Sequence, residues 1–139
     1  RVLAPDGRLA SALWAAPAEN PWFAIPREAV GAVLGVERAS FARAFGRLGD
    51  PGEAVDVHRA AGLRDVEARV LVAPVELSSA AEQWESLVRD NGHFRRIAAS
   101  ATGDQLAAIV QELELRLAGY RQGERLRLAR TLVLVTGRR

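Results

Sequence analysis

Apolar runs and helical stripes alternate along the chain, and their order predicts three strands with helices between them. Residues 8–14 form a short apolar run after a turn at residues 5–7, which is typical of a buried strand. Residues 66–77 are rich in Val and Leu, and Pro74 predicts that this second strand bends or ends there. Residues 126–136 alternate Leu with Arg and then become continuously apolar, which predicts the last strand. This order of elements indicates an α/β or α+β layer arrangement.

Proline and glycine positions predict the helices between the first two strands. Pro26 suits the first turn of a helix, where its missing N–H costs nothing, and apolar residues follow at helical spacing over residues 30–34. A second helical piece is expected over residues 41–45. Asp50 is a good N-cap for a further helix, and Gly62 is its C-terminal stop.

Two capping signals predict the helices that follow the second strand. Ser79 and Glu82 form a capping-box pair before a helix that carries Trp84 on its inner face. Thr102 and Gln105 repeat this signal before the clearest helix of the chain. The apolar stripe of that helix consists of Leu106, Ile109, Val110, Leu113, Leu117 and Tyr120.

The composition is that of a globular chain without a strongly charged partner. Hydrophobic residues make up 49% of the 139 residues, and no apolar run approaches the ~18 residues needed to cross a bilayer. All 19 basic residues are Arg, yet the net charge is only +2, so a nucleic-acid partner is not expected. The chain has no Cys, which excludes disulfides. We therefore expect a cytoplasmic domain that binds neither nucleic acid nor membrane.

Four short segments carry a resemblance to a known family. Residues 2–9 read Val-Leu-Ala-Pro-Asp-Gly-Arg-Leu, and they are followed by Trp14 and by Asn-Pro-Trp-Phe at residues 20–23. Residues 61–66 read Ala-Gly-Leu-Arg-Asp-Val, and residues 132–138 end the chain with an apolar run, Thr and Arg. This succession resembles the C-terminal half of class I S-adenosylmethionine-dependent methyltransferases of the ubiquinone/menaquinone-biosynthesis type, the methyltransferase type 11 family.

The resemblance implies a fold for the whole chain. Residues 1–139 would form a single domain, the C-terminal part of a Rossmann-like sheet, with helical insertions at about residues 22–48 and 78–121. The three predicted strands would be the fifth, sixth and seventh of that sheet, in the spatial order 5-7-6. Two positions depart from the family pattern, because Asp6 replaces a Gly and Leu63 replaces a Phe.

The resemblance also implies where the methyl donor binds. The family holds S-adenosylmethionine with a Gly-rich loop, because a side chain there would block close approach of backbone to ligand. This chain contains no Gly-x-Gly and begins with Arg1 rather than Met, so we expect a piece that lacks the donor-binding half. S-adenosylmethionine is then a cofactor of the parent protein, no cofactor is expected on this piece, and the piece alone is expected to be inactive.

The aromatic residues are the candidate site. Trp14, at the end of the first strand, and Trp84 are expected to line a pocket for a small, apolar acceptor together with Asn20, Trp22 and Phe23. The alternative is that these residues are ordinary core. No residue is assigned as a catalytic base.

The other titratable residues carry no predicted chemistry. His58 is expected at the core boundary and His93 in a loop, and two distant histidines without Cys form no metal-ligand spacing. The densest basic region is expected to be a solvated face rather than a phosphate site. It consists of Arg121, Arg125, Arg127, Arg130, Arg138 and Arg139.

Two other functions stay open, and so does the partner. The chain could be a complete, non-enzymatic small-molecule-binding domain, or an oligomerisation domain that packs its Leu106–Leu117 stripe on another chain. If the fourth strand of the family sheet is missing, the edge of residues 9–14 is an open pairing hazard. We expect that edge to be covered by the missing N-terminal half or by another copy of the chain in a homo-oligomer.

Overall fold

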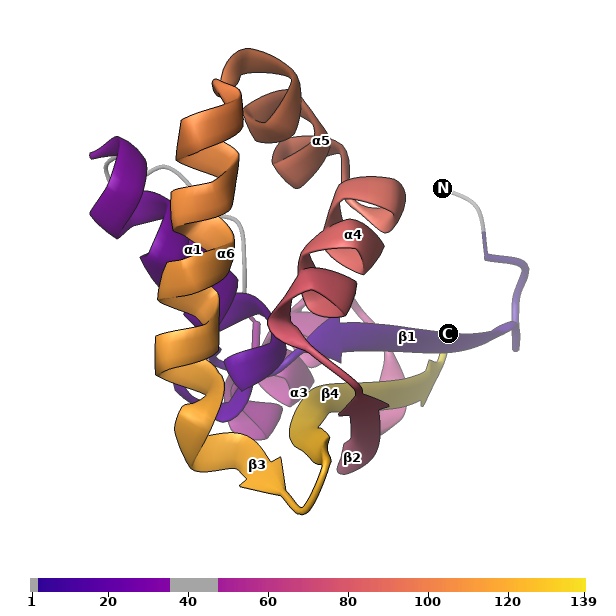
Figure 1. Cartoon of the computed structure of the whole chain (residues 1–139). Coiled ribbons are helices and arrows are strands. Elements are labelled where there is room, and N and C mark those ends of the chain that lie inside the picture. The colour runs from indigo at the N-terminus through magenta and orange to yellow at the C-terminus, as the bar shows by residue number, and fades with distance from the viewer. Residues whose placement is uncertain (1–2, 36–47) are drawn as a thin grey trace. The chain divides into compact units, whose positions relative to one another are not determined.

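The computed structural model describes residues 3–35 and 48–139. The chain divides into two compact units. The first contains residues 1–20, 39–73 and 129–139, and the second contains residues 21–38 and 74–128. The helical piece expected over residues 41–45 lies outside the described residues. Figure 1 shows the elements in chain order.

A mixed α/β structure is built on one sheet with the strand order β1-β4-β2 (Figure 1). These strands are β1 (Arg8–Trp14), β4 (Arg125–Arg138) and β2 (Arg64–Leu77), and the short β3 (Arg121–Gln122) pairs with β4. Neighbouring strands run antiparallel, so β1 and β2 run in the same direction. The predicted arrangement, with the last strand between the other two, is therefore confirmed.

The ladder between β1 and β4 has a definite register, which assigns side chains to the two faces of the sheet. The Arg139 N–H donates to the Gly7 carbonyl at 3.0 Å, and the Ala15 N–H donates to the Thr131 carbonyl at 3.1 Å. Odd-numbered residues of β1 thus form the hydrogen-bonded pairs with β4. Even-numbered residues form the non-hydrogen-bonded pairs, whose side chains lie closest together.

One face of this sheet is covered by α3 (Pro51–Ala60) and forms the core of the first unit. The helix begins as predicted: the Asp50 carboxylate accepts from the Glu53 N–H at 2.9 Å. It also ends as predicted, because Gly62 has φ +86°, which favours glycine. The buried cluster consists of Ala15, Ala54, Val66, Val133 and Val135.

The second strand ends at Leu77, the last residue of its Val- and Leu-rich range, and begins at Arg64. Pro74 does not end it, since β2 continues to Leu77. Val66 is buried, but Val70 and Val72 are 52% and 64% exposed. The alternating Val residues of β2 are therefore buried only near the start of the strand.

The second unit contains α1 (Pro21–Leu34), α4 (Ala80–Asp90), α5 (Gly92–Ser100) and α6 (Gly103–Leu117). Helices α1 and α6 pack side by side (Figure 1). The predicted stripe of α6 is buried at Ile109, Leu113 and Leu117, which are fully covered. Tyr120 lies beyond the helix and is exposed.

Arg116 links the two packed helices through its guanidinium. Its Nε donates to Glu112 at 2.7 Å, which is the predicted pair one turn apart on α6. Its other nitrogen donates to Glu28 of α1 at 2.9 Å. Because all three side chains are about one-third exposed, this network orients the helices more than it stabilises them.

The capping signals were partly right. Thr102 and Gln105 form the full capping box of α6. Ser79 caps α4 by accepting from the Glu82 N–H, but the Glu82 carboxylate bonds Ser78 at 2.7 and 2.6 Å instead of returning to Ser79. These bonds stabilise the ionised carboxylate and lower the pKa of Glu82.

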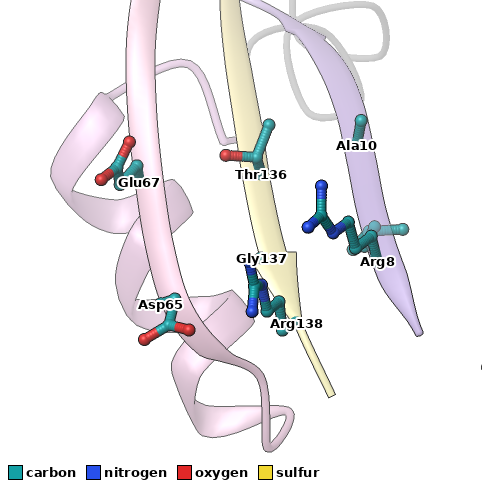
Figure 2. A pocket seen from close by; sticks show the side chains of 8 residues that line it. Arg8, Ala10, Asp65, Glu67, Thr136, Gly137 and Arg138 are labelled. Carbon is teal, nitrogen blue, oxygen red and sulfur yellow. The ribbon is translucent and has the colours of Figure 1, made fainter. Parts of the chain in front are cut away.

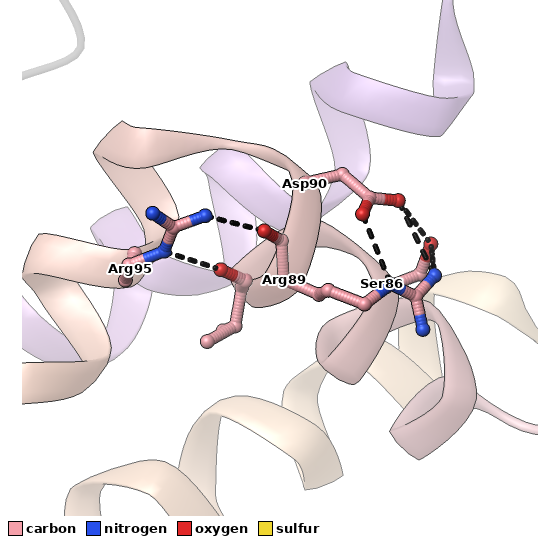
Figure 3. Close-up of polar contacts among 5 residues, drawn as sticks. Ser86, Arg89, Asp90 and Arg95 are labelled. Carbon is pink, nitrogen blue, oxygen red and sulfur yellow. Dashed lines mark hydrogen bonds and ion pairs between the residues drawn. The ribbon is translucent and has the colours of Figure 1, made fainter.

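The sequence did not predict α5, which follows α4 after a single residue. The Asn91 side chain caps it by accepting from the His93 N–H at 2.9 Å. Figure 3 shows how Arg95 of α5 reaches back to the end of α4, where it donates to the carbonyls of Val88 and Arg89. The last carbonyls of a helix lack partners within the helix and attract cations, so this contact stabilises the tight turn.

The start of α1 corrects one prediction. The helix begins at Pro21, and Pro26 lies inside it rather than in its first turn. A proline has no N–H, so the Trp22 carbonyl four residues earlier loses its partner within the helix. The Gln83 side chain of α4 donates to that carbonyl at 3.0 Å and fills the gap.

Candidate functional site

Trp14 is the last residue of β1 and lies at the carboxyl end of that strand, as predicted. It faces Leu132 of β4 in a non-hydrogen-bonded pair and is half-buried. It shares a sheet face with Ala10 and Ala12, opposite the face covered by α3. Trp14 thus combines an aromatic surface with partial exposure, which suits contact with an apolar molecule.

Asn20 has a structural task that accounts for its burial. It follows a short 3-10 turn at Pro17–Glu19 and is fully covered. Its Nδ2 donates to the carbonyls of Ala15 and Thr131, at 3.1 and 2.9 Å, and its Oδ1 accepts from the Thr131 N–H at 2.8 Å. The Asn20 amide therefore bonds the two backbone groups, the Thr131 N–H and the Ala15 carbonyl, that would otherwise form the second hydrogen bond of the Ala15–Thr131 pair. Both of its N–H donors are used inside the protein.

The other three predicted residues belong to the second unit and are buried in it. Trp22 and Phe23 are 3% and 8% exposed, and their rings meet edge to face with centroids 6.5 Å apart. Trp84 is 6% exposed and meets Phe94 of α5 edge to face at 5.8 Å. These contacts are those of a helical core, and a role in holding an acceptor stays a prediction.

Gln83 lies among these aromatic residues and was not singled out from the sequence. It is fully buried, with its Nε2 on the Trp22 carbonyl. Its Oε1 has no hydrogen-bond partner among the described residues. The sequence signal that could have revealed Gln83 is the proline in α1, since an internal proline demands a donor from elsewhere.

His58 pairs with a serine that the sequence pattern did not single out. Its Nδ1 donates to the Ala54 carbonyl at 2.6 Å, and its Nε2 forms a hydrogen bond with the Ser11 hydroxyl at 3.3 Å. An activated nucleophile requires a hydroxyl next to an imidazole that a third group orients, and Ser11, His58 and the Ala54 carbonyl have this arrangement. The pair lies on the sheet face that α3 covers, so it ties the helix to β1, in line with the predicted boundary position of His58.

His93 occupies the first turn of α5 rather than a loop. Partial burial disfavours its charged form and, with repulsion from Arg96, holds the pKa of this imidazole below its ordinary value of 6.5. His93 contacts Phe94 edge to face at 5.8 Å.

The described residues contain no metal-binding cluster, and none of their helices is long and apolar enough to cross a membrane. Two residues of the basic region form ion pairs within the second unit, Arg121 with Glu114 and Arg127 with Glu76. No protein-family model and no curated protein matches the chain.

Proposed function

We propose that this chain forms the acceptor side and lid of an S-adenosylmethionine-dependent methyltransferase that acts on a small, apolar molecule. The strand order carries the proposal. The resemblance requires the last strand to lie between the other two, and β4 lies between β1 and β2. That order is not a consequence of the local sequence pattern, which predicts strands but not their neighbours.

The grouping of the helices is a second support. Helix α1 follows β1, and helices α4 to α6 follow β2, at the places of the two expected insertions. Although they are far apart in the sequence, both sets belong to the same compact unit, with α1 packed on α6. Two insertions that fold together into one body are suited to act as the lid of the parent enzyme.

Donor binding is assigned to a part of the parent protein outside this chain. The glycine directly before β1 is Gly7, and a Cβ there would lie 2.9 Å from the Ala4 carbonyl oxygen. The Gly7 N–H donates to the same carbonyl at 3.0 Å, so the turn before β1 requires a glycine here. Gly7 therefore does not provide space for a ligand. This residue gives no support for a donor site beside β1, and we assign the chemistry of the donor to another part of the parent protein.

The role left to this chain is positioning. Methyl transfer requires an aligned acceptor in a site from which water is excluded. Trp14 would supply an apolar surface for the acceptor at the carboxyl end of β1, and the helical lid would exclude water. We assign no catalytic base.

The oligomerisation alternative loses its main support. It requires an accessible α6 stripe, but Ile109, Leu113 and Leu117 are fully covered inside the second unit. The alternative of a non-enzymatic binding domain predicts no methyl transfer, so a turnover assay separates it from the proposal.

The test uses the protein translated from the whole reading frame, labelled S-adenosylmethionine, and a series of phenols and quinols with increasing alkyl length. Methyl transfer is expected, and Trp14→Ala should lower kcat/KM for the acceptor about tenfold while the Kd of the donor is unchanged. Tyr120→Ala, at an exposed aromatic residue, serves as the control. The proposal is wrong if the whole protein transfers no methyl group and its gene encodes no Gly-rich strand–loop–helix segment before Arg1.

A further inference from the structure

A groove of about 490 Å³ opens in the first unit, on the sheet at the end opposite Trp14. It is formed where β1 and β2 begin and β4 ends (Figure 2). Its lining includes Arg8, Ala10, Asp65, Glu67, Thr136 and Arg138. This groove does not include Trp14 of the proposed acceptor site, so the charged side chains of the groove are not explained by acceptor binding.

Two arginines of the groove lie directly opposite each other on neighbouring strands. Arg8 and Arg138 are direct partners across the β1–β4 ladder. The hydrogen bond from Arg139 N–H to the Gly7 carbonyl makes the next pair the bonded one, so Arg8 and Arg138 form a non-hydrogen-bonded pair. Their Cα atoms are then about 4.5 Å apart, the closest spacing in an antiparallel sheet.

This arrangement is unfavourable in the free protein. Like charges directly opposite each other across two strands are destabilising. Among the described residues, no carboxylate forms an ion pair with Arg8 or Arg138. The acidic residues that line the groove, Asp65 and Glu67, lie on β2, beyond β4. An anion bound between the two guanidinium groups would remove the repulsion.

The neighbouring positions suit such an anion. Thr136 lies two residues before Arg138 on the same face of the sheet and is paired with Ala10 of β1. Its hydroxyl can donate to an anion, and the small side chain of Ala10 leaves space beside it. Figure 2 shows Arg8, Ala10, Thr136 and Arg138 together on β1 and β4.

The far side of the groove carries the opposite charge. Asp65 and Glu67 project from β2, about 10 Å from β1, which is two strand spacings. Asp65 has φ +50°, a conformation that L residues rarely adopt. Glu67 faces Arg69 at 3.8 Å, and both side chains are well exposed, so this weak pair leaves the carboxylate accessible. The groove is thus positive on one side and negative on the other.

We propose that this groove binds a small dipolar molecule. Its carboxylate or phosphate group lies between Arg8 and Arg138 with a hydrogen bond from Thr136. Its amino group lies toward Glu67. Guanidinium groups match both kinds of anion by paired hydrogen bonds, and the carboxylates of β2 disfavour ligands with many negative charges.

The proposal is tested by following backbone amide signals in NMR titrations of the whole chain. The probes are inorganic phosphate, hexanoate and 6-aminohexanoate, which separate the two anions and isolate the effect of the amine. Saturable shifts are expected at Arg8, Thr136 and Arg138, with tighter binding of 6-aminohexanoate than of hexanoate. Glu67→Gln should remove that advantage.

The double variant Arg8→Gln/Arg138→Gln should weaken binding at least about tenfold. Arg125→Gln, which removes one positive charge from the same strand but outside the groove, should leave binding unchanged. Because the double variant removes the repulsion between the two arginines, its Tm without ligand should equal or exceed that of the wild type, which excludes unfolding as the cause of lost binding. Saturation by none of the three probes, or undiminished binding by the double variant, would overturn the proposal.

Discussion

At the scale of single residues, two side-chain amides complete backbone hydrogen bonding where the chain cannot do so alone. Asn20 occupies the last rung of the β1–β4 ladder, and Gln83 serves a carbonyl that Pro26 leaves open. Both amides are fully buried. In each case the side chain replaces a backbone partner, so its removal exposes a buried polar group to an apolar surrounding.

Asn20→Ala is expected to lower the free energy of unfolding by about 2–4 kcal/mol, because the Ala15 carbonyl and the Thr131 N–H lose their partner in the interior. Asn20→Asp should be no better, since a carboxylate cannot donate to the two carbonyls that Asn20 now bonds. Urea denaturation measures both changes. A loss below about 0.5 kcal/mol for Asn20→Ala would contradict the structural task assigned to Asn20.

The lowered pKa of His93 makes one contribution to stability depend on pH. As the pH falls below 6.5, the unfolded chain takes up the proton first, so acid favours unfolding. This contribution is full above pH 6.5, is lost as the pH falls through the lowered folded-state pKa, and disappears in His93→Gln. An NMR titration of the imidazole should give a midpoint below 6.5 that Arg96→Gln raises only in part, since burial is the larger cause. A midpoint at or above 6.5 would count against this explanation.

At the scale of elements, helix α1 depends on a donor from another helix. Gln83→Leu is expected to destabilise the protein by about 1–3 kcal/mol, because the Trp22 carbonyl is left without a partner. In a Pro26→Ala background the restored N–H can bond that carbonyl, so the same change should cost at least about 1 kcal/mol less. A double-mutant cycle measures this coupling, and additive effects would show that the proline gap is not what Gln83 fills.

Sequence patterns predicted the three long strands and most helix ends because these depend on neighbouring residues, but they did not predict the short β3. The turn before β1, the Asp50 cap of α3 and the Thr102 box of α6 are local, and all three were predicted. The helix α5 was missed because its start lies in the residue that ends α4. The position of Pro26 inside α1 was missed because Gln83, which compensates for it, lies 61 residues along the chain from the carbonyl that it bonds.

The candidate sites also differ in how far the local sequence pattern determines them. Trp14 was placed at the end of its strand by pattern alone. The opposition of Arg8 and Arg138 depends on the register between two strands at opposite ends of the chain, which no local pattern contains. The burial of Trp22, Phe23 and Trp84 likewise follows from packing within the helical unit.

At the scale of the whole molecule, β1 has one strand neighbour, β4, in the part of the chain that the structure describes. The even-numbered residues of β1 direct their backbone N–H and carbonyl groups to the other edge. We predict that this edge pairs with a second copy when the chain is studied alone. Ala12→Pro removes an outward N–H without touching the bonds to β4, and should reduce the dimer seen by analytical ultracentrifugation.

Leu13→Pro is the matched comparison, because it breaks a bond within the sheet and should destabilise the fold. A wild-type chain that stays monomeric at high concentration, or a dimer that survives Ala12→Pro, would show that this edge is not the interface.

We propose above that this chain forms the acceptor side of a protein whose donor site lies elsewhere in the same polypeptide. Titration calorimetry with S-adenosylmethionine tests it most directly, on the 139-residue chain and on the protein from the whole reading frame. We predict saturable donor binding by the whole protein and none by the chain. Donor binding by the chain alone, or no binding by the whole protein, would contradict the claim.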